Sequence, residues 1–200
     1  SNYTPASSVE LTSLAGDVTL LSGASNILPG HLGLVALNGS LTVNGNLTLA
    51  PAPNGNLDLF AAGSIRIADS LAMSDVAVSA LASPLSPQQV LDNATGAVTA
   101  THLHTNPPLH ASDTEPVRIV ALGGDIVGRT EADSLYLPKQ AIIQAGGDIV
   151  DLGIVGQNLA DGDVTRVIAG GDIVFNAARQ TDGGFVTNKL GIELGGPGRL

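Results

Sequence analysis

The sequence contains no cysteine, and aromatic residues make up only 2% of its 200 positions. The absence of cysteine excludes a disulfide framework, a thiolate metal site and a cysteine nucleophile. Apolar residues nevertheless form 44% of the chain, so the core has to be built from valine, leucine, isoleucine and alanine. This composition favours thin, repetitive layers over an irregular globular centre.

Basic residues are also scarce. Eight lysines and arginines stand against 18 acidic residues, which gives a net charge of −10, and no stretch clusters basic residues as a phosphate-binding surface requires. We therefore expect no nucleic-acid partner and no attraction to anionic membranes. No apolar run approaches the roughly 20 residues that span a bilayer. The first residues lack the basic and apolar regions of an export signal, so we expect a processed chain or a piece of a longer one.

One six-residue phrase recurs along the chain. It reads AGGDIV at residues 145–150 and 169–174, and LGGDIV at 122–127. The second glycine of each copy serves as a marker, and looser copies extend the series upstream with spacings of 23 or 24 residues inside each group of three. The markers are Gly16, Gly39, Gly63, Gly124, Gly147 and Gly171. A period of this size is typical of a solenoid.

Residues at fixed offsets from the markers share their chemistry. Two residues after the marker stand Val18, Leu41, Ile65, Ile126, Ile149 and Ile173. Four residues before it stand Thr12, Val35, Leu59, Val120, Ile143 and Val167. β-Branched residues dominate both columns, as a pleated, half-buried surface selects. We therefore expect each column to stack into a ladder.

The local pattern indicates short strands rather than helices. Apolar residues alternate with polar ones between residues 40 and 70, and glycine or Asn-Gly interrupts each run. Such dipeptides also suit a β-meander of hairpins, but a meander gives no reason for columns to recur every 23 or 24 residues. We predict an all-β fold, a parallel β-helix of about 23–24 residues per coil with coils about 4.8 Å apart.

The repeated phrase is interpreted as a corner of the coil. In this interpretation the glycines supply a positive φ, the aspartates accept hydrogen bonds from turn amides, and the following isoleucine re-enters the core. The structural turn residues are Gly124, Asp125, Gly147, Asp148, Gly171 and Asp172. Stacked carboxylates about 5 Å apart repel unless they are solvated, hydrogen-bonded or bridged by a cation. A calcium ladder is the alternative, although the nonapeptide of calcium-binding β-rolls is absent.

An insertion interrupts the repeat. The 61 residues from Gly63 to Gly124 are not a multiple of the coil, and the excess lies at 83–116, which holds five of the eleven prolines and three of the four histidines. We predict coils over 1–82, an insertion over 83–116 with a short helix at 87–92, and coils over 117–200 that weaken after residue 175. Long insertions on repeat scaffolds commonly carry function.

The histidines of the insertion, His102, His104 and His110, are binding-surface candidates. With Asp113 they also form a weak metal candidate. His102 and His104 stand at i and i+2, so in an extended segment they would point the same way, and Asp113 could add a carboxylate. The alternative is a solvated polar loop whose histidines bond locally, since the spacing matches no zinc motif and Pro107-Pro108 separates the last histidine from the others. We predict no catalytic residue, no bound metal and no cofactor.

Several stretches together resemble a known family. PNGNLDLFAAGSIRIADSLAMSD, followed by a Pro-rich insertion, VRIVALGGDIVG and LPKQAIIQAGGDIVDLGIVGQNL, resemble the filamentous haemagglutinin-like exoproteins of Gram-negative bacteria. More narrowly, they resemble the haemagglutinin-associated domain in the C-terminal region of some members. The resemblance covers about residues 12 to 175. It implies a right-handed β-helix, two-partner secretion through an outer-membrane β-barrel transporter, and display or release as an adhesin.

The leading functional hypothesis is a non-enzymatic segment of a secreted or surface-displayed adhesin, a fragment of a much longer chain. It would act as a shaft and contact a host or bacterial cell-surface glycan or protein. One alternative is the shaft of a contact-dependent toxin-delivery exoprotein. Another is an enzyme acting on acidic polysaccharides, which needs clustered charged residues on neighbouring coils. Arg118 and Arg166 differ in their offsets from the markers, so we expect them to lie on different faces, which argues against such a site. Asp151, Asp161 and Asp163 are interpreted as turn residues.

Overall fold

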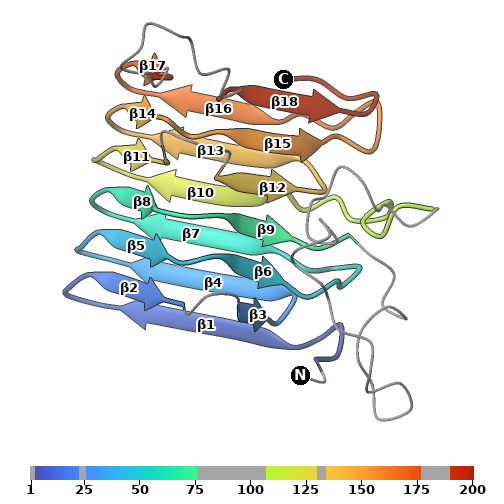
Figure 1. The fold of residues 1–200 in the computed structure, drawn as a ribbon, viewed down its shortest axis with the longest axis horizontal. Coiled ribbons are helices and arrows are strands. Elements are labelled where there is room, and N and C mark those ends of the chain that lie inside the picture. The colour runs from blue at the N-terminus through green and yellow to red at the C-terminus, as the bar shows by residue number, and fades with distance from the viewer. Residues whose placement is uncertain (1–2, 23–25, 76–106, 130–133, 177–189) are drawn as a thin grey trace, which may run out of the picture.

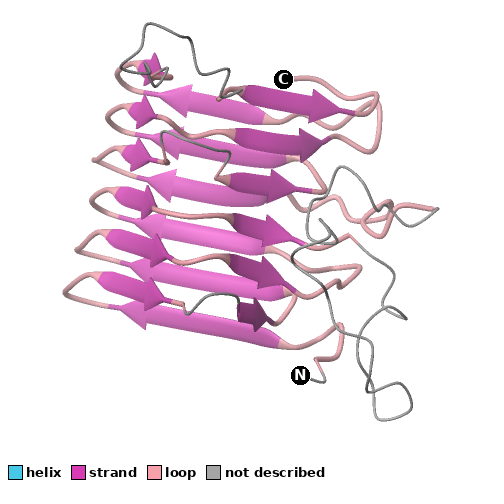
Figure 2. Cartoon of the chain, viewed as in Figure 1, coloured by secondary structure: helices cyan, strands magenta, loops and turns pink. Residues whose placement is uncertain are grey.

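The computed structural model describes residues 3–22, 26–75, 107–129, 134–176 and 190–200. These residues form strands and no helix, and the strands stack as flat coils one above another (Figure 1; Figure 2). Every strand pairing is parallel within three six-stranded sheets. This arrangement confirms the predicted all-β parallel β-helix. Because the described residues contain no helix, they include no apolar helix that could cross a membrane.

Each coil contributes one strand to each sheet. The first sheet contains β1 (Ser8–Ser13), β4 (His31–Ala36), β7 (Leu57–Ala61), β10 (Val117–Ala121), β13 (Ala141–Ala145) and β16 (Arg166–Ala169). The second contains β2 (Val18–Leu21), β5 (Leu41–Asn44), β8 (Ile65–Ile67), β11 (Ile126–Val127), β14 (Ile149–Val150) and β17 (Ile173–Val174). The third contains β3 (Asn26–Leu28), β6 (Leu47–Leu49), β9 (Leu71–Met73), β12 (Leu135–Leu137), β15 (Ile154–Gln157) and β18 (Ile192–Gly195).

The interior is filled by rows of aliphatic residues, where a row is the series of residues that pair from coil to coil. The column two residues after the markers forms one unbroken row along the second sheet, as predicted. Its members are buried from Val18 to Ile149, and Ile173 in the last coil is 45% exposed. Branched aliphatic side chains therefore build a narrow core without aromatic rings.

The prediction for the other column is wrong. Val35 pairs with Phe60, not with Leu59, and Leu59 pairs with Ile119, not with Val120. The corner between the first and second sheets has four residues in some coils and three in others, so a fixed offset from the glycine changes face. A one-residue shift exchanges the inward and outward sides of a strand. The true inward row is Leu11, Leu34, Leu59, Ile119, Ile143 and Val167.

A row of small residues ends the strands of the first sheet, and it was not predicted. It consists of Ser13, Ala36, Ala61, Ala121, Ala145 and Ala169. The four alanines of the inner coils are at most 2% exposed. Small side chains let the first and second sheets meet closely at this corner, which explains why alanine opens the repeated AGGDIV phrase.

The sheets differ in how regularly the chain returns to them. Along the second sheet, paired residues are separated by 23, 24, 61, 23 and 24 positions. Along the third sheet the separations are 21, 24, 64, 19 and 38. The segments of irregular length therefore lie on both sides of the third sheet, and the longest of them follows β9.

The insertion lies at the corner between the third and first sheets. The chain leaves after β9 and returns at β10, which begins at Val117, directly after the predicted insertion. Residues 76–106, which include the predicted helix at 87–92, lie outside the described residues. In the predicted weaker segment after residue 175, β18 pairs in parallel with β15 and completes the third sheet of the last coil.

Candidate contact surface

The aspartates of the repeated phrase join neighbouring coils. Asp125 Oδ1 accepts a hydrogen bond from the backbone N–H of Asp148 at 2.8 Å, and Asp148 Oδ1 accepts one from Asp172 at 2.7 Å. Asp17 makes the same bond to Ser40, and the hydroxyls of Ser40 and Ser64 continue the series to the next coil. These oxygens therefore accept hydrogen bonds from the next coil. The sequence interpretation, in which they bond the amides of their own turn, is wrong on this point.

The glycines of the phrase serve close approach, and the prediction of a positive φ is wrong. Among the described glycines only Gly45 and Gly196 have φ in the left-handed region. A Cβ atom on Gly147 would overlap Asp125 Oδ1, and one on Gly171 would overlap Asp148 Oδ1. The aspartate of one coil and the glycine of the next therefore act as a pair, which answers why both are repeated together.

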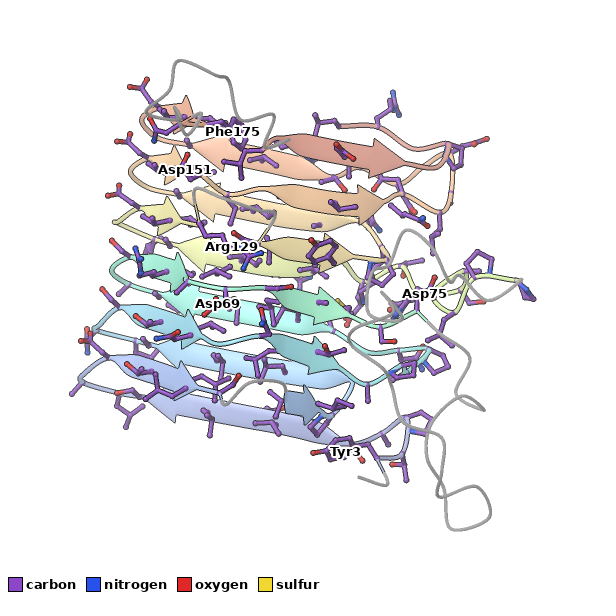
Figure 3. All side chains as sticks on the ribbon, viewed as in Figure 1. Tyr3, Asp69, Asp75, Arg129, Asp151 and Phe175 are labelled. Atoms are coloured by element: carbon purple, nitrogen blue, oxygen red, sulfur yellow. The ribbon has the colours of Figure 1, made fainter. Side chains whose placement is uncertain are left out.

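The described end of the insertion is docked onto the solenoid. The backbone N–H of Leu109 donates to Asp75 Oδ1 at 3.1 Å, just after β9. Gln140 Nε2, just before β13, donates to the carbonyl of Thr114 at 3.0 Å. Asp75 lies on the side of the stack where this segment joins it (Figure 3). Residues 107–116 therefore bridge the coil before the insertion and the second coil after it.

A buried polar cluster lies beneath this docked segment. Lys139 Nζ donates to Asp113 Oδ2 at 2.6 Å, and His110 Nδ1 lies 3.3 Å from the same oxygen. The side chains of Lys139, Asp113 and His110 are 2%, 7% and 1% exposed. The backbone N–H of Glu115 donates to the other oxygen, Asp113 Oδ1, at 3.0 Å. Every charged partner in the cluster is thus paired, as burial of charge requires.

The cluster shifts the titration of two of its members. Burial acts to raise the pKa of Asp113, but the hydrogen bonds from Lys139 and from the Glu115 amide outweigh it, so the pKa of Asp113 is lowered. Burial, reinforced by the charge of Lys139, lowers the pKa of His110 despite its contact with Asp113. The cluster at neutral pH therefore holds a lysine–aspartate ion pair beside an uncharged imidazole.

The predicted metal candidates have different positions. His110 and Asp113 do lie together, but the ammonium of Lys139 bonds the carboxylate that a metal would need. Across the described ranges, no group of three histidine, aspartate or glutamate side chains is placed to hold a metal ion. His102 and His104 lie outside those ranges. His110 is buried against Asp113. Its side chain therefore helps to dock the insertion and is not displayed on the surface.

Lys139 was missed by the sequence analysis. It stands between the buried Pro138 and the strand β13 and is among the largest fully buried side chains. The only signal in the sequence is its place in LPKQAII, where one cation interrupts an apolar run. A lysine before a strand is usually solvated, so the pattern alone does not indicate burial.

The outward face of the first sheet carries a mixed row of charges. Asp58 pairs with Arg118, and the same row continues through Ile142 to Arg166. The expectation that the two arginines lie on different faces is therefore wrong. Both stand three residues before the alanine row, and their different offsets from the markers reflect corners of four and three residues.

Asp58 lies at the centre of this charged row. Its Oδ2 atom is 3.9 Å from Nε2 of His31, and both side chains are about one-third exposed at 34%. Burial raises the pKa of Asp58, and the neighbouring Arg118, together with His31 when its imidazole is protonated, opposes that rise. The first sheet therefore presents acidic and basic groups on adjacent coils of one face.

A hollow of about 340 Å³ opens beside this face at the first coil, lined by residues that include Ser7, Glu10, His31 and Asn54. Its lining mixes carboxylate, imidazole, hydroxyl and amide groups. Such groups hydrogen-bond to sugars and to polar side chains alike. The hollow therefore extends the polar surface of the first sheet toward the first coil.

The chain matches no protein-family model, no curated protein and no solved structure. The resemblance to filamentous haemagglutinins therefore rests on the quoted motifs alone, and a functional proposal has to be argued from the fold and its surfaces.

Two further aspartates, Asp163 and Asp151, accept hydrogen bonds through their carboxylates. Asp163 Oδ2 accepts hydrogen bonds from the backbone N–H groups of Leu159 and Ala160 at 2.8 and 2.9 Å. Asp151, at the end of β14 (Figure 3), has a positive φ of 51° and accepts a hydrogen bond from Asn176 Nδ2 at 3.0 Å. The carboxylate of Asp163 thus makes the turn contacts that the DGD sequence indicates, whereas that of Asp151 bonds a residue 25 positions further along the chain.

Proposed function

We propose that this chain is a non-enzymatic shaft segment of a secreted or surface-displayed adhesin of the filamentous haemagglutinin-like type. The observation that carries the proposal is a continuous aliphatic stack, with the described end of the predicted insertion, residues 107–116, docked on its side. The coils are joined at every level by the same side chain to backbone hydrogen bonds. A stack of this kind holds attached segments at a fixed place and height.

The composition supports the proposed export. A chain without cysteine cannot form disulfides before it crosses a membrane pore, and neighbouring coils that contact mainly each other can fold as they emerge. We therefore propose an outer-membrane β-barrel transporter as the export partner and the surface of a Gram-negative cell, or the medium, as the location. Both follow from the family resemblance.

The proposed contact surface is the insertion, and its partner is a glycan or protein on a host or bacterial cell. The supporting observation is the buried ion pair of Lys139 and Asp113, with His110 against it. Burying two charges is costly unless both are well bonded. A chain that only covered the side of the stack could use apolar contacts, so a specific polar dock supports a role that needs the insertion in one position.

The test is cell and glycan binding by the whole chain. A variant that lacks residues 83–106 keeps the docked segment 107–116 and its cluster, so the solenoid should stay intact. We expect saturable binding to cells or to a glycan array that this deletion abolishes, with or without calcium. A matched control deletes part of the exposed loop around Asp161. Binding that survives the first deletion unchanged would refute the insertion as the contact surface.

A second candidate is recognition of acidic polysaccharides on the first sheet, with or without cleavage. The row of Asp58, Arg118 and Arg166 favours it, because parallel coils place cations at regular intervals along an outer face. Arginine binds carboxylates through paired N–H donors. Incubation with uronate polymers tests this function: retention that is lost in Arg118→Ala supports binding, and release of unsaturated or reducing ends would show cleavage. If the chain neither retains nor cleaves these polymers, the adhesin proposal stands.

A further inference from the structure

The outward face of the first sheet has a notch at its second coil. Gly33 lies in the middle of β4, and its partners in the strand pairs are Glu10 on one side and Asp58 on the other. The two acidic residues are therefore two strand spacings apart, about 10 Å, with no side chain between them. A Cβ atom on Gly33 would meet only Glu10 Cγ, at 3.4 Å. Packing within the chain thus does not require glycine here, and a glycine inside a strand is one mark of a place where a ligand approaches closely.

Unequal corner lengths widen this notch into the hollow of about 340 Å³. The second coil passes from β3 to β4 through Pro29-Gly30 alone, whereas the third coil passes from β6 to β7 through residues 50–56 (Figure 1). The longer segment lies tightly on the shorter one, since a Cβ atom on Gly30 would overlap it. This segment and residues 5–8 of the first coil border the hollow, and His31 lines it from the coil between them. The hollow therefore lies on the side of the stack, with described coils on both sides of it, and does not depend on where the stack ends.

Asn56 supplies a buried hydrogen-bond acceptor without a partner at the same place. It lies beside His31 of the coil below, one position before the paired residues of β4 and β7. Asn56 is 2% exposed, and its Nδ2 donates to Asp58 Oδ2 at 3.1 Å and to the carbonyl of Pro116 in the coil above at 3.4 Å. Oδ1 branches the other way, toward the coil of His31, and has no hydrogen-bond partner within the described part of the chain. Buried oxygens are normally bonded, so Oδ1 points to a missing donor.

The gap between His31 and Asp58 has room for that donor. Nε2 of His31 lies 3.9 Å from Asp58 Oδ2, which is too far for a hydrogen bond, and polar groups at such a separation are commonly bridged by a third group. Glu10 adds a second carboxylate across the notch. Among the described residues that line the hollow, none is a lysine or an arginine. The site is therefore rich in acceptors and negative charge, and it fits a ligand that brings donors and positive charge.

An apolar edge borders the notch on its other side. Phe60 and Val35 pair with each other two positions beyond Asp58 and Gly33 on the outward face, and both are half-buried. Phe60 is one of only three phenylalanines in the chain, and the face of an aromatic ring attracts cations. Ligand sites combine apolar surface of this kind with a few placed polar groups. A lone ammonium would use the carboxylates only, whereas a sugar ring also presents C–H groups on its faces and hydroxyl donors at its edge.

We propose that this notch binds an amino sugar, a sugar residue that carries a free, positively charged amine. The amine lies between Asp58 and His31, in line with the free acceptor of Asn56. The ring covers Gly33, and its hydroxyl groups reach Glu10 at the opposite wall. The site goes beyond the proposed contact surface, because it lies on the solenoid itself and takes no ligand contact from the insertion. An N-acetyl group on the amine would remove the charge and is expected to prevent binding.

The test is calorimetric titration of the whole chain with a glucosamine tetramer and, as the matched ligand, an N-acetylglucosamine tetramer. We expect saturable binding of the first and binding of the second that is at least about tenfold weaker. Asp58→Asn and Glu10→Gln should each weaken binding of the glucosamine tetramer at least about tenfold, because each removes a charged acceptor. Gly33→Val should abolish binding, because it fills the notch and leaves every charge in place.

The controls separate binding from folding and from the insertion. Glu10, Gly33 and Asp58 all lie on the outward face, so each variant should keep the thermal unfolding midpoint of the parent. Asp161→Asn, in an exposed loop, makes the same change in charge and should bind normally. The variant that lacks residues 83–106 should also bind normally, so this result stands apart from the test of the insertion. Absence of binding, binding that survives Gly33→Val, or equal affinity for the N-acetylated tetramer or for oligolysine would overturn the proposal.

Discussion

Two corners of the coil follow opposite rules. The corner between the first and second sheets has three or four residues in every coil and repeats a glycine followed by an aspartate or serine. The corner between the third and first sheets varies in length and carries the insertion and its buried ion pair. We call the first the strict corner and the second the variable corner. One strict corner is enough to set the register of the coils, and the variable corner is then free to change in length.

The strict corner works even across the insertion. Ile65 pairs with Ile126 although 61 positions separate them, and Ser64 Oγ accepts the backbone N–H of Asp125 at 3.1 Å. The coil after the insertion is therefore held on the coil before it by the same contact that joins directly consecutive coils. Loop closure entropy grows only slowly with loop length, so a regular corner can tolerate a long excursion on the far side.

The largest loss of stability is expected from a substitution at the variable corner. Lys139→Met leaves the carboxylate of Asp113 buried without its cation, and loss of one partner of a buried pair costs about 3–5 kcal/mol. Denaturant unfolding should show this loss. The double variant Lys139→Met with Asp113→Leu replaces both charges by apolar groups and should recover most of it. A single variant as stable as the double would contradict the view that the ion pair docks the insertion.

Acid should weaken the same corner in two stages. The pKa of His110 is lowered in the folded chain, so the unfolded chain takes up a proton first and stability falls as pH drops through the ordinary range of histidine, near about 6.5. The pKa of Asp113 is also lowered. Its contribution is present above the ordinary aspartate value, near about 3.9, and is lost as pH falls through the still lower folded pKa. Unfolding measured against pH checks this, and His110→Gln should remove only the first stage.

A smaller effect is expected at the strict corner. Gly147→Ala places a Cβ atom against Asp125 Oδ1, and overpacking of this kind costs about 1–3 kcal/mol. Adding Asp125→Ala removes the overlap but leaves the amide of Asp148 without its acceptor. The two changes should therefore be strongly non-additive in a double-mutant cycle. Additive losses would mean that glycine and aspartate do not act as a pair between coils.

The same contrast explains what could be predicted from the sequence. The row from Val18 to Ile173 was predictable because it lies within three residues of the glycine marker, where every coil has the same length. The row through Leu59 was assigned incorrectly because Ala62-Gly63 is one residue shorter than Leu122-Gly123-Gly124, and a single position exchanges the two faces. A period identifies a solenoid but does not locate these one-residue differences.

The buried cluster was beyond this kind of reasoning for a different reason. His110 and Asp113 were grouped in one weak metal candidate within the insertion, but their partner Lys139 is 26 residues from Asp113 and belongs to the solenoid. No periodic pattern connects an insertion to the coil on which it docks. The nature of the site, an internal ion pair in place of a metal site, therefore depends on a long-range contact.

The smallest effect on stability is expected from a substitution in the first coil. Gly16→Ala makes the change of Gly147→Ala at the one marker glycine with no described coil beneath it. The free energy of unfolding should change by no more than about 0.5 kcal/mol, the usual range for an exposed position. A loss as large as that of Gly147→Ala would mean that the glycine is needed within its own turn, and that the contact with an aspartate of the coil below does not explain why the position is glycine.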